Sequence, residues 1–417
     1  MSAPIPAFGA YGVELEYMIV AADTLDVQPV ADRVLAQMEG GCAGARPPAE
    51  VIDGDYGWSN ELVCHLLELK NPCPLPSLDG VAAGMQARVA RMNGLLEPMG
   101  LRLMPTGMHP WMRPGSETVL WPHHNGAVYA AYDRIFDCRT HGWANLQSQH
   151  LNLPFADDAE FARLHAAARL VLPILPAIAA SSPFREGRAA GWHDSRLEAY
   201  SRHAAAVPSL TGPLVPESVS SQRQYEAEIL QPIYGDLCAL DPDGTLRHEW
   251  INARGAIARF DRNALEIRVL DTQECPAADL AVSALAADAV RYLFEGNGPA
   301  LEIQEAFETA RLRRILLDCA RTAESTRIDD AAYLALLGFK GGDCEARALW
   351  TDLAARLEAA GMPNVALWRG HLDTVLREGT LATRLLRAGG QTPDREALGG
   401  VYRELCECLA TGTTFTS

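Results

Sequence analysis

Three short segments of the chain alternate apolar side chains with polar ones, and carboxylates recur among the polar ones. The polar positions, each two residues from the next, are Glu14 and Glu16; Ser148, His150 and Asn152; and Glu266 and Arg268. Side chains two apart in a β-strand point to the same face of a sheet. If these segments share one sheet, several carboxylates, an imidazole and an arginine meet on its polar face. Carboxylates with one imidazole suit Mg²⁺ or Mn²⁺ better than zinc.

A polar strand face also has an ordinary explanation. One face of an antiparallel sheet is often solvated, and polar residues there need no chemical role. The acidic bias argues against this explanation, because like charges such as Glu14 and Glu16 repel each other unless a cation lies between them. Glu68, in the apolar segment 61–70, could join the same face. The pattern alone indicates a cation site and names no reaction.

Periodicity predicts the elements that must position these residues. Strands are expected over residues 11–20, 61–70, 101–106, 146–153 and 264–270, and helices over 78–97, from Asp157 or Asp158 to about 180, and 277–294. Beyond residue 300 the long segments are helical, over 301–322, 329–337, 344–360, 363–377 and 395–410. We therefore expect an α+β catalytic domain over residues 1–299 and a helical C-terminal region over 300–417. If those helices cover the mouth of the site, they would select the acceptor.

Composition restricts the class of protein. The net charge of −17 argues against a general nucleic-acid-binding protein, which would carry a basic face. The ten cysteines include no CxxC pair, so we expect reduced thiols. The first 17 residues lack the pattern of a signal peptide, and the apolar stretch at 170–180 is too short to cross a bilayer. These features predict a cytoplasmic protein without a membrane or nucleic-acid partner.

Several motifs resemble those of one family. Residues 12–16, GVELE, resemble the opening GxExE strand of the glutamate–cysteine ligase family, in particular of its bacterial carboxylate–amine ligase branch. Similar segments follow in the family's order at 61–69, 106–110, 150–153, 181–188, 191–196 and 265–271, of which SSPFREGR and LEIRVLD are the most specific. Residues 252–260 are similar to the phosphate-binding arginine stretch of glutamine synthetases. The resemblance covers about residues 8–300.

The resemblance implies a glutamine-synthetase-like, curved antiparallel sheet with flanking helices. It also implies an ATP-dependent ligase that joins a carboxylate, the γ-carboxylate of glutamate, to an amine or amino acid through an acyl phosphate. ATP and Mg²⁺, or Mn²⁺, would bind on the concave face. The partners would be small-molecule carboxylate and amine substrates, and relatives suggest a homodimer.

Roles for individual residues follow from the same resemblance. The implied metal ligands are Glu14, Glu16, Glu68, His150 and Glu266. Glu266 and Arg268 would be catalytic, with Arg268 on the transferred phosphate, and Arg254 and Arg259 would hold the ATP phosphates. The implied substrate-binding residues are Arg188, Arg196, Ser195, His109 and Asn152. Arg188 and Arg196 could instead be surface ion-pairing residues, and Asp271 could cap the next helix or orient Arg268.

Two positions depart from the family pattern. Asn152 stands where the family often has a second histidine, and Met108 replaces a threonine beside His109. An amide oxygen can still serve a hard metal, so the first change weakens the expected site without abolishing it. Two other functions stay open at this stage: a catalytically inactive ligand-binding homologue, and a metal-dependent amidohydrolase of the same fold. The sequence does not identify the amine.

Overall fold

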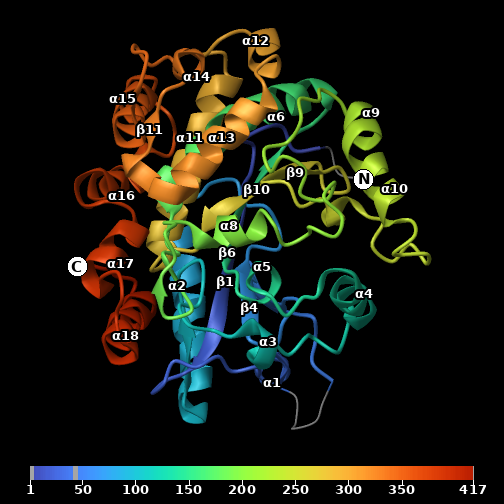
Figure 1. The fold of residues 1–417 in the computed structure, drawn as a ribbon, viewed down its shortest axis with the longest axis vertical. Coiled ribbons are helices and arrows are strands. Elements are labelled where there is room, and N and C mark those ends of the chain that lie inside the picture. Colours follow the sequence, from blue (N-terminus) through green and yellow to red (C-terminus); the bar gives the residue numbers. More distant parts are fainter. Residues whose placement is uncertain (1–3, 41–45, 417) are drawn as a thin grey trace.

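The computed structural model describes residues 4–40 and 46–416, and it is built on one antiparallel sheet (Figure 1). The eight strands follow the order β2-β3-β4-β1-β6-β10-β9, and β5 pairs with the end of β1. Their bounds are β1 Gly12–Ala21, β2 Glu50–Asp53, β3 Tyr56–Asn60, β4 Leu66–Lys70, β5 Leu101–Met104, β6 Ser148–Pro154, β9 Ala256–Arg259 and β10 Ala264–Asp271. Two short hairpins lie outside it, β7 Phe184–Arg185 with β8 Arg188–Ala189, and β11 Arg327–Ile328 with β12 Cys344–Glu345.

The strand register confirms that the predicted polar positions share one face. Glu14 lies opposite His150, Glu16 opposite Glu68, and Glu266 opposite Asn152. Residues that face each other across an antiparallel pair project to the same side of the sheet. The intervening apolar side chains of β1, β4, β6 and β10 enter the main hydrophobic core on the other side.

Three long helices cover the apolar face. They are α2 (Val81–Leu96), α6 (Asp158–Val171) and α11 (Pro276–Phe294), and each contacts strands of the sheet. Asp157 caps α6 by accepting a hydrogen bond from the backbone N–H of Glu160. The predicted single helix to about residue 180 is wrong, because α6 gives way to a 3-10 turn, η2 (Leu172–Ile174), and then to α7 (Pro176–Ala179). Pro173 and Pro176 lack the N–H that would continue the α-helical ladder.

Shorter elements lie on the polar side. The segments that reach the site are α4 (Gly126–Phe136), α5 (His141–Ala144), α8 (Ser195–Tyr200) and the turn η4 (Glu249–Ile251). The other elements before residue 300 are α1 (Ala31–Met38), η1 (Glu97–Met99), α3 (Pro114–Glu117), α9 (Gln222–Tyr225), η3 (Glu226–Leu230) and α10 (Gln231–Leu237). The predicted strand over 61–70 begins only at Leu66, because residues 63–65 pair outside that ladder: Val63 with Leu120, and the His65 carbonyl with Ile19.

The chain after residue 300 is helical, as predicted. Its helices are α12 (Leu301–Glu305), α13 (Thr309–Thr322), α14 (Ala331–Leu336), α15 (Ala346–Ala359), α16 (Val365–Glu378), α17 (Leu381–Gly389) and α18 (Arg395–Thr411). An η5 turn (Ala323–Ser325) follows α13. The single helix expected over 301–322 is wrong, because the chain is extended at Glu308 between α12 and α13. The helix α17 was not predicted.

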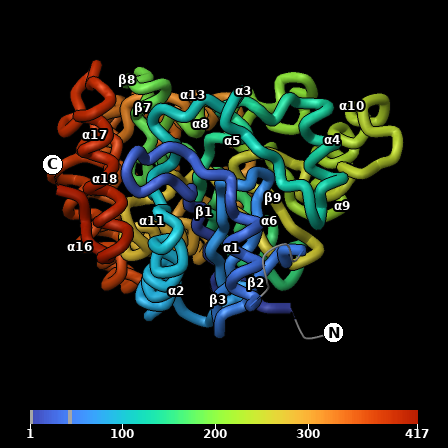
Figure 2. Tube along the Cα trace, turned by 90° about the horizontal axis from the view of Figure 1, so that it is seen from below, coloured from blue at the N-terminus to red at the C-terminus, as the bar shows by residue number. Residues whose placement is uncertain are grey.

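Helices α16, α17 and α18 lie beside α2, on the opposite side of the molecule from α4 and α10 (Figures 1 and 2). Helix α16 packs on α11, and α18 packs on α2 and β5. The core runs from the strands into this region without a break, since residues as far along as Leu409 belong to it. The boundary near residue 299 remains a prediction. These helices were to select the acceptor only if they cover the mouth of the site, and that condition is not met.

Two other expectations concern the chain as a whole. The nine cysteines within the described residues are all free thiols, and Cys42 lies outside those residues. Among the helices that the structure describes, none combines the length and the apolar character that a bilayer crossing needs.

Candidate active site

A cavity of about 470 Å³ lies between the polar face of the sheet and the helices α4, α5 and α8. Carboxylates from three strands line it, together with arginines from α8, β9 and β10. Its lining residues extend along the chain from Glu14 to Arg268. The predicted polar face is therefore partly covered, and Glu16, Glu68 and Glu266 are buried on it, which they would not be on a merely solvated sheet face.

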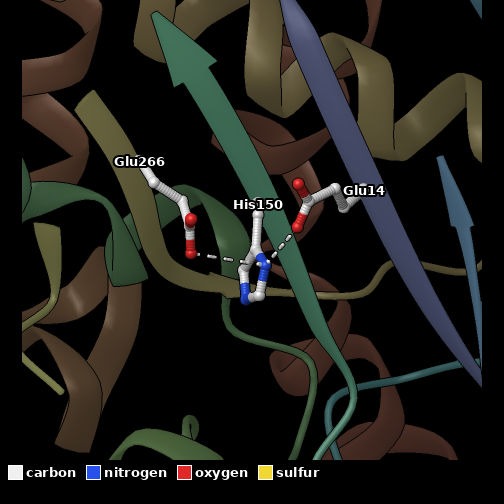
Figure 3. A group of neighbouring side chains, drawn as sticks. All are labelled: Glu14, His150 and Glu266. Atoms are coloured by element: carbon white, nitrogen blue, oxygen red, sulfur yellow. Dashed lines mark hydrogen bonds and ion pairs between the residues drawn. The ribbon is translucent and has the colours of Figure 1, made fainter. Parts of the chain in front are cut away.

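Three residues on three adjacent strands form the tightest cluster, Glu14 on β1, His150 on β6 and Glu266 on β10 (Figure 3). Each offers one ligand atom, and these atoms lie within 4.8 Å of one another. The His150 Nδ1 is 2.8 Å from Glu14 Oε2 and 3.8 Å from Glu266 Oε1. Two carboxylates and one imidazole at this spacing fit a hard divalent cation.

The electrostatics of the cluster favour charged groups. Burial tends to lower the pKa of His150, but its hydrogen bond to Glu14 and the nearby carboxylates outweigh burial and raise that pKa. Burial tends to raise the pKa of Glu14, and the contact with His150 brings it below its ordinary value. Glu266 follows the same logic, because Arg268 and His150 overcome burial and lower its pKa. The carboxylates are held ionised, as metal ligation requires.

A second acidic group lies beside the first, formed by Glu16, Glu61 and Glu68, all lining the cavity. Glu16 Oε2 accepts hydrogen bonds from the backbone N–H of Ser148 at 2.6 Å and from its hydroxyl at 2.9 Å. Lys70 contacts Glu68 at 2.9 Å. Burial, with Glu68 and Glu16 nearby, raises the pKa of Glu61 well above its ordinary value. Carboxylates that crowd each other in this way repel, and Lys70 balances part of their charge.

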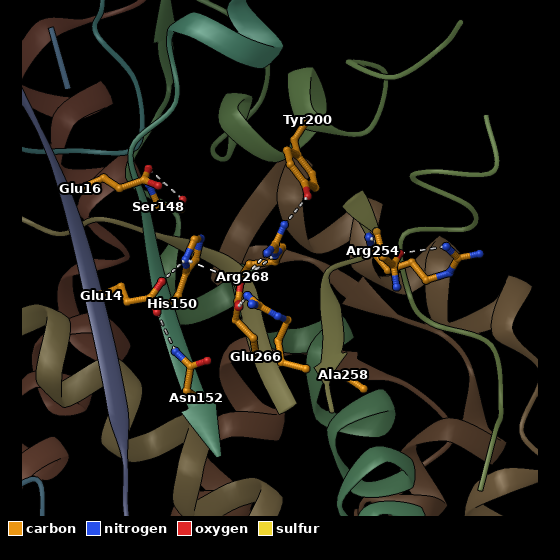
Figure 4. Close-up of polar contacts among 12 residues, drawn as sticks. Glu14, Glu16, Ser148, His150, Asn152, Tyr200, Arg254, Ala258, Glu266 and Arg268 are labelled. Carbon is orange, nitrogen blue, oxygen red and sulfur yellow. Dashed lines mark hydrogen bonds and ion pairs between the residues drawn. The ribbon is translucent and has the colours of Figure 1, made fainter. Parts of the chain in front are cut away.

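Two arginines lie against the first cluster. Arg268 donates from Nε to Glu266 Oε1 at 3.1 Å and from Nη1 to the Tyr200 hydroxyl at 3.4 Å (Figure 4). Arg259 Nη1 is 3.6 Å from the other oxygen of Glu266, and its Nη2 pairs with Asp261 at 3.0 Å. Arginine next to a cation site is the arrangement that stabilises phosphate oxygens during phosphoryl transfer.

Arg196 lines the cavity as a buried guanidinium, with 2% of its surface exposed. Its Nε donates to Asp271 Oδ1 at 2.5 Å, and its Nη1 to the backbone carbonyl of Arg268 at 3.3 Å. Its Nη2 has no hydrogen-bond partner among the described residues. A buried donor without a partner is costly in free energy.

An irregularity in β10 explains how Asp271 reaches Arg196. Ile267 lies opposite Leu151, but Leu270 lies opposite Gln149, so β10 carries one extra residue in a β-bulge. Regular alternation from Glu266 would place Asp271 on the apolar face. The bulge pairs Asp271 with Ser148 and so returns it to the polar face. There it also accepts from the Ser181 N–H at 2.8 Å and the Ser182 hydroxyl at 2.7 Å.

The structure brings most of the predicted residues together. Those lining the cavity are Glu14, Glu16, Glu68, His150, Glu266, Arg268, Arg259 and Arg196. Asn152 lies at the other end of the cluster, where its Nδ2 donates to Glu14 Oε1 at 3.1 Å. It lines an adjoining cavity of about 770 Å³ that shares Glu14, Glu61 and Glu68 with the first. Glu61 was not predicted as a site residue, although it begins the acidic motif at 61–69.

Four predicted residues do not line either cavity. Arg254 is buried on Glu217, with Nη2 2.7 Å from Oε1, and Figure 4 shows it apart from Glu14 and His150. Arg188 is exposed beside Glu186, which matches the alternative of a surface ion pair. His109 is fully buried, and its Nε2 is 2.8 Å from the Leu25 carbonyl.

Ser195 and Met108 also lie outside the cavities. Ser195 is the first residue of α8, so it supports the helix that carries Arg196, and its hydroxyl donates to the Trp192 carbonyl at 3.4 Å. Met108 is fully buried in the loop after β5 and does not line the cavity. The departure at Met108 therefore does not alter the lining of the site directly.

An open antiparallel sheet with carboxylates on the face beneath short helices is the glutamine-synthetase-like arrangement, and the α+β prediction is confirmed. The chain belongs to Glutamate-cysteine ligase family 2, whose pattern it matches over residues 10–406. The match extends across the predicted boundary at residue 299 and so includes the C-terminal helices.

Individual relatives agree with this assignment. An uncharacterized protein of Archaeoglobus fulgidus is 36% identical over 256 residues, which cover 61% of this chain and 67% of that protein. A putative glutamate–cysteine ligase 2-1 of Rhodococcus jostii is 27% identical over 311 residues, covering 70% and 69%. The crystal structure of a glutamate–cysteine ligase from Francisella tularensis in complex with AMP has a TM-score of 0.58 at 12% identity, covering 98% of this chain and 90% of that one.

Proposed function

We propose that this protein is an ATP-dependent ligase that forms an amide between a carboxylate, the γ-carboxylate of glutamate, and an amine. The observation that carries the proposal is a single cavity that holds two acidic groups, Arg268 and a buried Arg196 with an unpartnered nitrogen. Cation ligands and an arginine suit a triphosphate, and the second arginine suits a substrate carboxylate. Family membership supports the same class of reaction.

Amide formation from a free carboxylate needs activation, because an oxide is a poor leaving group. ATP would supply the phosphoryl group that converts the carboxylate into an acyl phosphate, which the amine then attacks. Arg196 would hold the donor's other carboxylate and fix its orientation. Arg268, held by Glu266 and Tyr200, would contact the oxygens of the transferred phosphoryl group. Arg259 would contact the same negative charge from β9.

Mg²⁺ or Mn²⁺ would neutralise the phosphate oxygens that meet in the cavity. Its proposed ligands are Glu14, His150 and Glu266 in one group and Glu16, Glu61 and Glu68 in the other. His150 must give up the proton shared with Glu14 when it acts as a ligand, because only a neutral imidazole nitrogen coordinates a metal. Cytoplasmic location and a homodimer remain predictions.

Two observations weigh on the alternatives. An amidohydrolase needs a metal-activated water, whereas four arginines line this cavity, more than water activation uses. An inactive homologue was suggested by Asn152 and Met108. Asn152 donates to Glu14 and keeps it in place, and Met108 is outside the lining, so neither change removes a ligand from the clusters.

The test is turnover with a general nucleophile. The purified protein is incubated with ATP, Mg²⁺, glutamate and hydroxylamine, and hydroxamate and ADP are measured together. We expect equal amounts of both, with loss of both when glutamate or Mg²⁺ is left out. A panel of other carboxylates shows whether glutamate is the donor. Tight nucleotide binding by calorimetry without any turnover would support the inactive homologue, and amide hydrolysis without nucleotide would support the amidohydrolase.

A further inference from the structure

Aromatic side chains line the 470 Å³ cavity on the side opposite the sheet. This aromatic wall consists of Tyr129, Tyr132, Trp143, Tyr200, His203 and Trp250. The rings are half-buried, and they pack on one another: the ring centres of Tyr132 and Trp143 are 5.0 Å apart, and those of Trp143 and His203 are 4.5 Å apart. Trp250 extends the wall, 6.1 Å from Tyr132.

The tyrosines and tryptophans of the wall pack against the main hydrophobic core. Phe136 is buried and stacks on the back of Trp143 at 5.3 Å, which fixes that indole in position. The Nε1 of Trp143 donates to the His203 carbonyl at 2.9 Å, so its ring cannot turn freely. Rigid ring faces that line a cavity favour a flat apolar group, because such a group covers apolar surface without losing hydrogen bonds.

The geometry of phosphoryl transfer determines which reactant lies against the wall. The donor oxygen and the departing ADP oxygen must lie on opposite sides of the phosphorus in an in-line transfer. Arg196 places the donor in the cavity of the aromatic wall. With its γ-phosphate at Arg268, the rest of the nucleotide would extend into the adjoining cavity, on the side of Asn152, where Tyr129 is the one aromatic residue among the described lining residues. The amine approaches the acyl carbon from the donor side and so meets the wall.

The wall carries no positive charge. The cations that line the cavity are Lys70, Arg196, Arg259, Arg262 and Arg268. Each is paired with a carboxylate: Lys70 with Glu68, Arg196 with Asp271, Arg259 and Arg262 with Asp261, and Arg268 with Glu266. Only Arg268 also contacts a wall residue, since its Nη1 donates to the Tyr200 hydroxyl at 3.4 Å. Burial lowers the pKa of His203 to about 4, so its imidazole is neutral at pH 7. An amino acid acceptor would bring a carboxylate that needs a cation of its own. A simple amine has no such requirement.

We propose that the acceptor is a primary amine that carries an aromatic ring and no carboxylate, and that the aromatic wall binds its ring. This inference rests on the proposed ligase function. The amine nitrogen attacks the acyl phosphate carbon, the C–N bond forms, the carbon–oxygen bond to phosphate breaks, and the amine releases one proton. The products are an amide, ADP and inorganic phosphate, so no oxidant or further reactant is needed.

The experiment compares matched amines with the full-length protein. Phenylethylamine, hexylamine and phenylalanine are each supplied with ATP, Mg²⁺ and glutamate, and hydroxylamine serves as the general acceptor. Stacking on aromatic rings is worth about two- to tenfold in kcat/KM beyond apolar area alone. We expect phenylethylamine to exceed hexylamine by about that factor and to exceed phenylalanine by a larger one.

Variants locate the preference on the wall. Tyr132→Leu and Trp250→Leu remove a ring and should reduce the ratio of phenylethylamine to hexylamine, whereas Trp250→Phe should retain it. Phe339→Leu removes a half-buried ring in the C-terminal region and serves as the matched control. The ratio of two amines within one variant is the readout, so a general loss of activity or of folded protein cancels.

The outcomes separate this inference from the proposed function. Hydroxamate formation together with equal use of hexylamine, or better use of phenylalanine or cysteine, overturns the aromatic acceptor and leaves the ligase in place. Absence of hydroxamate with every carboxylate overturns the ligase itself. If Trp250→Leu raises KM for ATP and leaves the ratio of amines unchanged, the wall binds the nucleotide base and the acceptor inference is wrong.

Discussion

Replacement of Glu266 by glutamine tests the centre of the site with a change of charge and almost none of shape. Glu266 is 3% exposed and contacts Arg268, Arg259 and His150, of which His150 is 3.8 Å away. Glutamine cannot balance these cations and is a poorer ligand for a hard metal. Removal of one preorganised charge from such a site costs on the order of 10²- to 10³-fold in kcat.

Stability changes as well, and the magnitude follows from burial. Loss of one partner from a buried ion pair costs about 3 to 5 kcal/mol in the free energy of unfolding. The Arg268 side chain keeps 18% of its exposure, so water can solvate it in part, and we expect the lower end of that range. Glu324→Gln is the matched control, because Glu324 is also 3% exposed and accepts hydrogen bonds from Thr380 and Thr383.

The assay is hydroxamate formation at a temperature where urea titration shows both variants fully folded. Glu324→Gln should lose stability and retain its kcat, and Glu266→Gln should lose both. A folded Glu266→Gln protein with kcat within threefold of the parent chain would refute the assignment of Glu266 to the reaction.

Three further changes test the supports of the site. Arg196→Lys should raise KM for the donor carboxylate by about 10- to 150-fold, because a point charge cannot both hold Asp271 and bind a substrate, and a charged hydrogen bond is worth about 1.5–3 kcal/mol. Gly107→Ala should raise the same KM and lower stability, because an added Cβ would lie 2.4 Å from the Asp271 carboxyl carbon. His165→Phe should flatten the loss of stability at acid pH. Burial, with Arg169 and Arg254, lowers the pKa of His165 from 6.5 to about 3, so the unfolded chain binds a proton below pH 6.5 that the folded chain refuses. Stability present at neutral pH is thus lost as pH falls, by about 1.4 kcal/mol per pH unit for this group.

Each of these changes has its own control. Arg202→Lys alters a 74% exposed arginine on the turn after α8 and should leave the donor KM unchanged. Gly94→Ala adds a Cβ with nothing within 4 Å and should be neutral or slightly stabilising. Equal pH slopes for His165→Phe and the parent chain in urea titrations between pH 6.5 and 4 would contradict the sign worked out above, as would an unchanged donor KM in Arg196→Lys or Gly107→Ala.

The polar face of the sheet could be predicted from the sequence because it depends on a local rule. Period-2 alternation sorts Glu14 from Leu15 whatever the rest of the chain does, and the observed pairing of Glu14 with His150 needed only that the strands share a sheet. The apolar stripe of α2 was predictable for the same reason. Such features can be predicted because the local alternation of residues alone determines which face a side chain takes.

Other parts of the site depend on long-range geometry. The aromatic wall draws its rings from helices and turns between residues 129 and 250, with no common period. Arg254 lies within the arginine segment 252–260, but the direction of its side chain is decided by Glu217, 37 residues earlier in the sequence. Glu61 joins the acidic cluster because its segment is not part of the β4 ladder. The apolar residues of segment 61–70 gave no sign that the strand begins only at Leu66.

The bulge in β10 divides that strand into two parts whose side chains alternate between the two faces of the sheet in opposite order. Residues up to Ile267 follow one alternation of inside and outside, and residues from Leu270 follow the opposite one. Deletion of a single residue between them would restore a regular strand and turn the Asp271 carboxylate into the apolar layer, away from Arg196. Substitutions at these positions cannot produce that change, because they leave the number of residues in the strand, and so the bulge, unchanged. Insertions and deletions within this strand should therefore be less tolerated than replacements that keep Arg268 and Asp271.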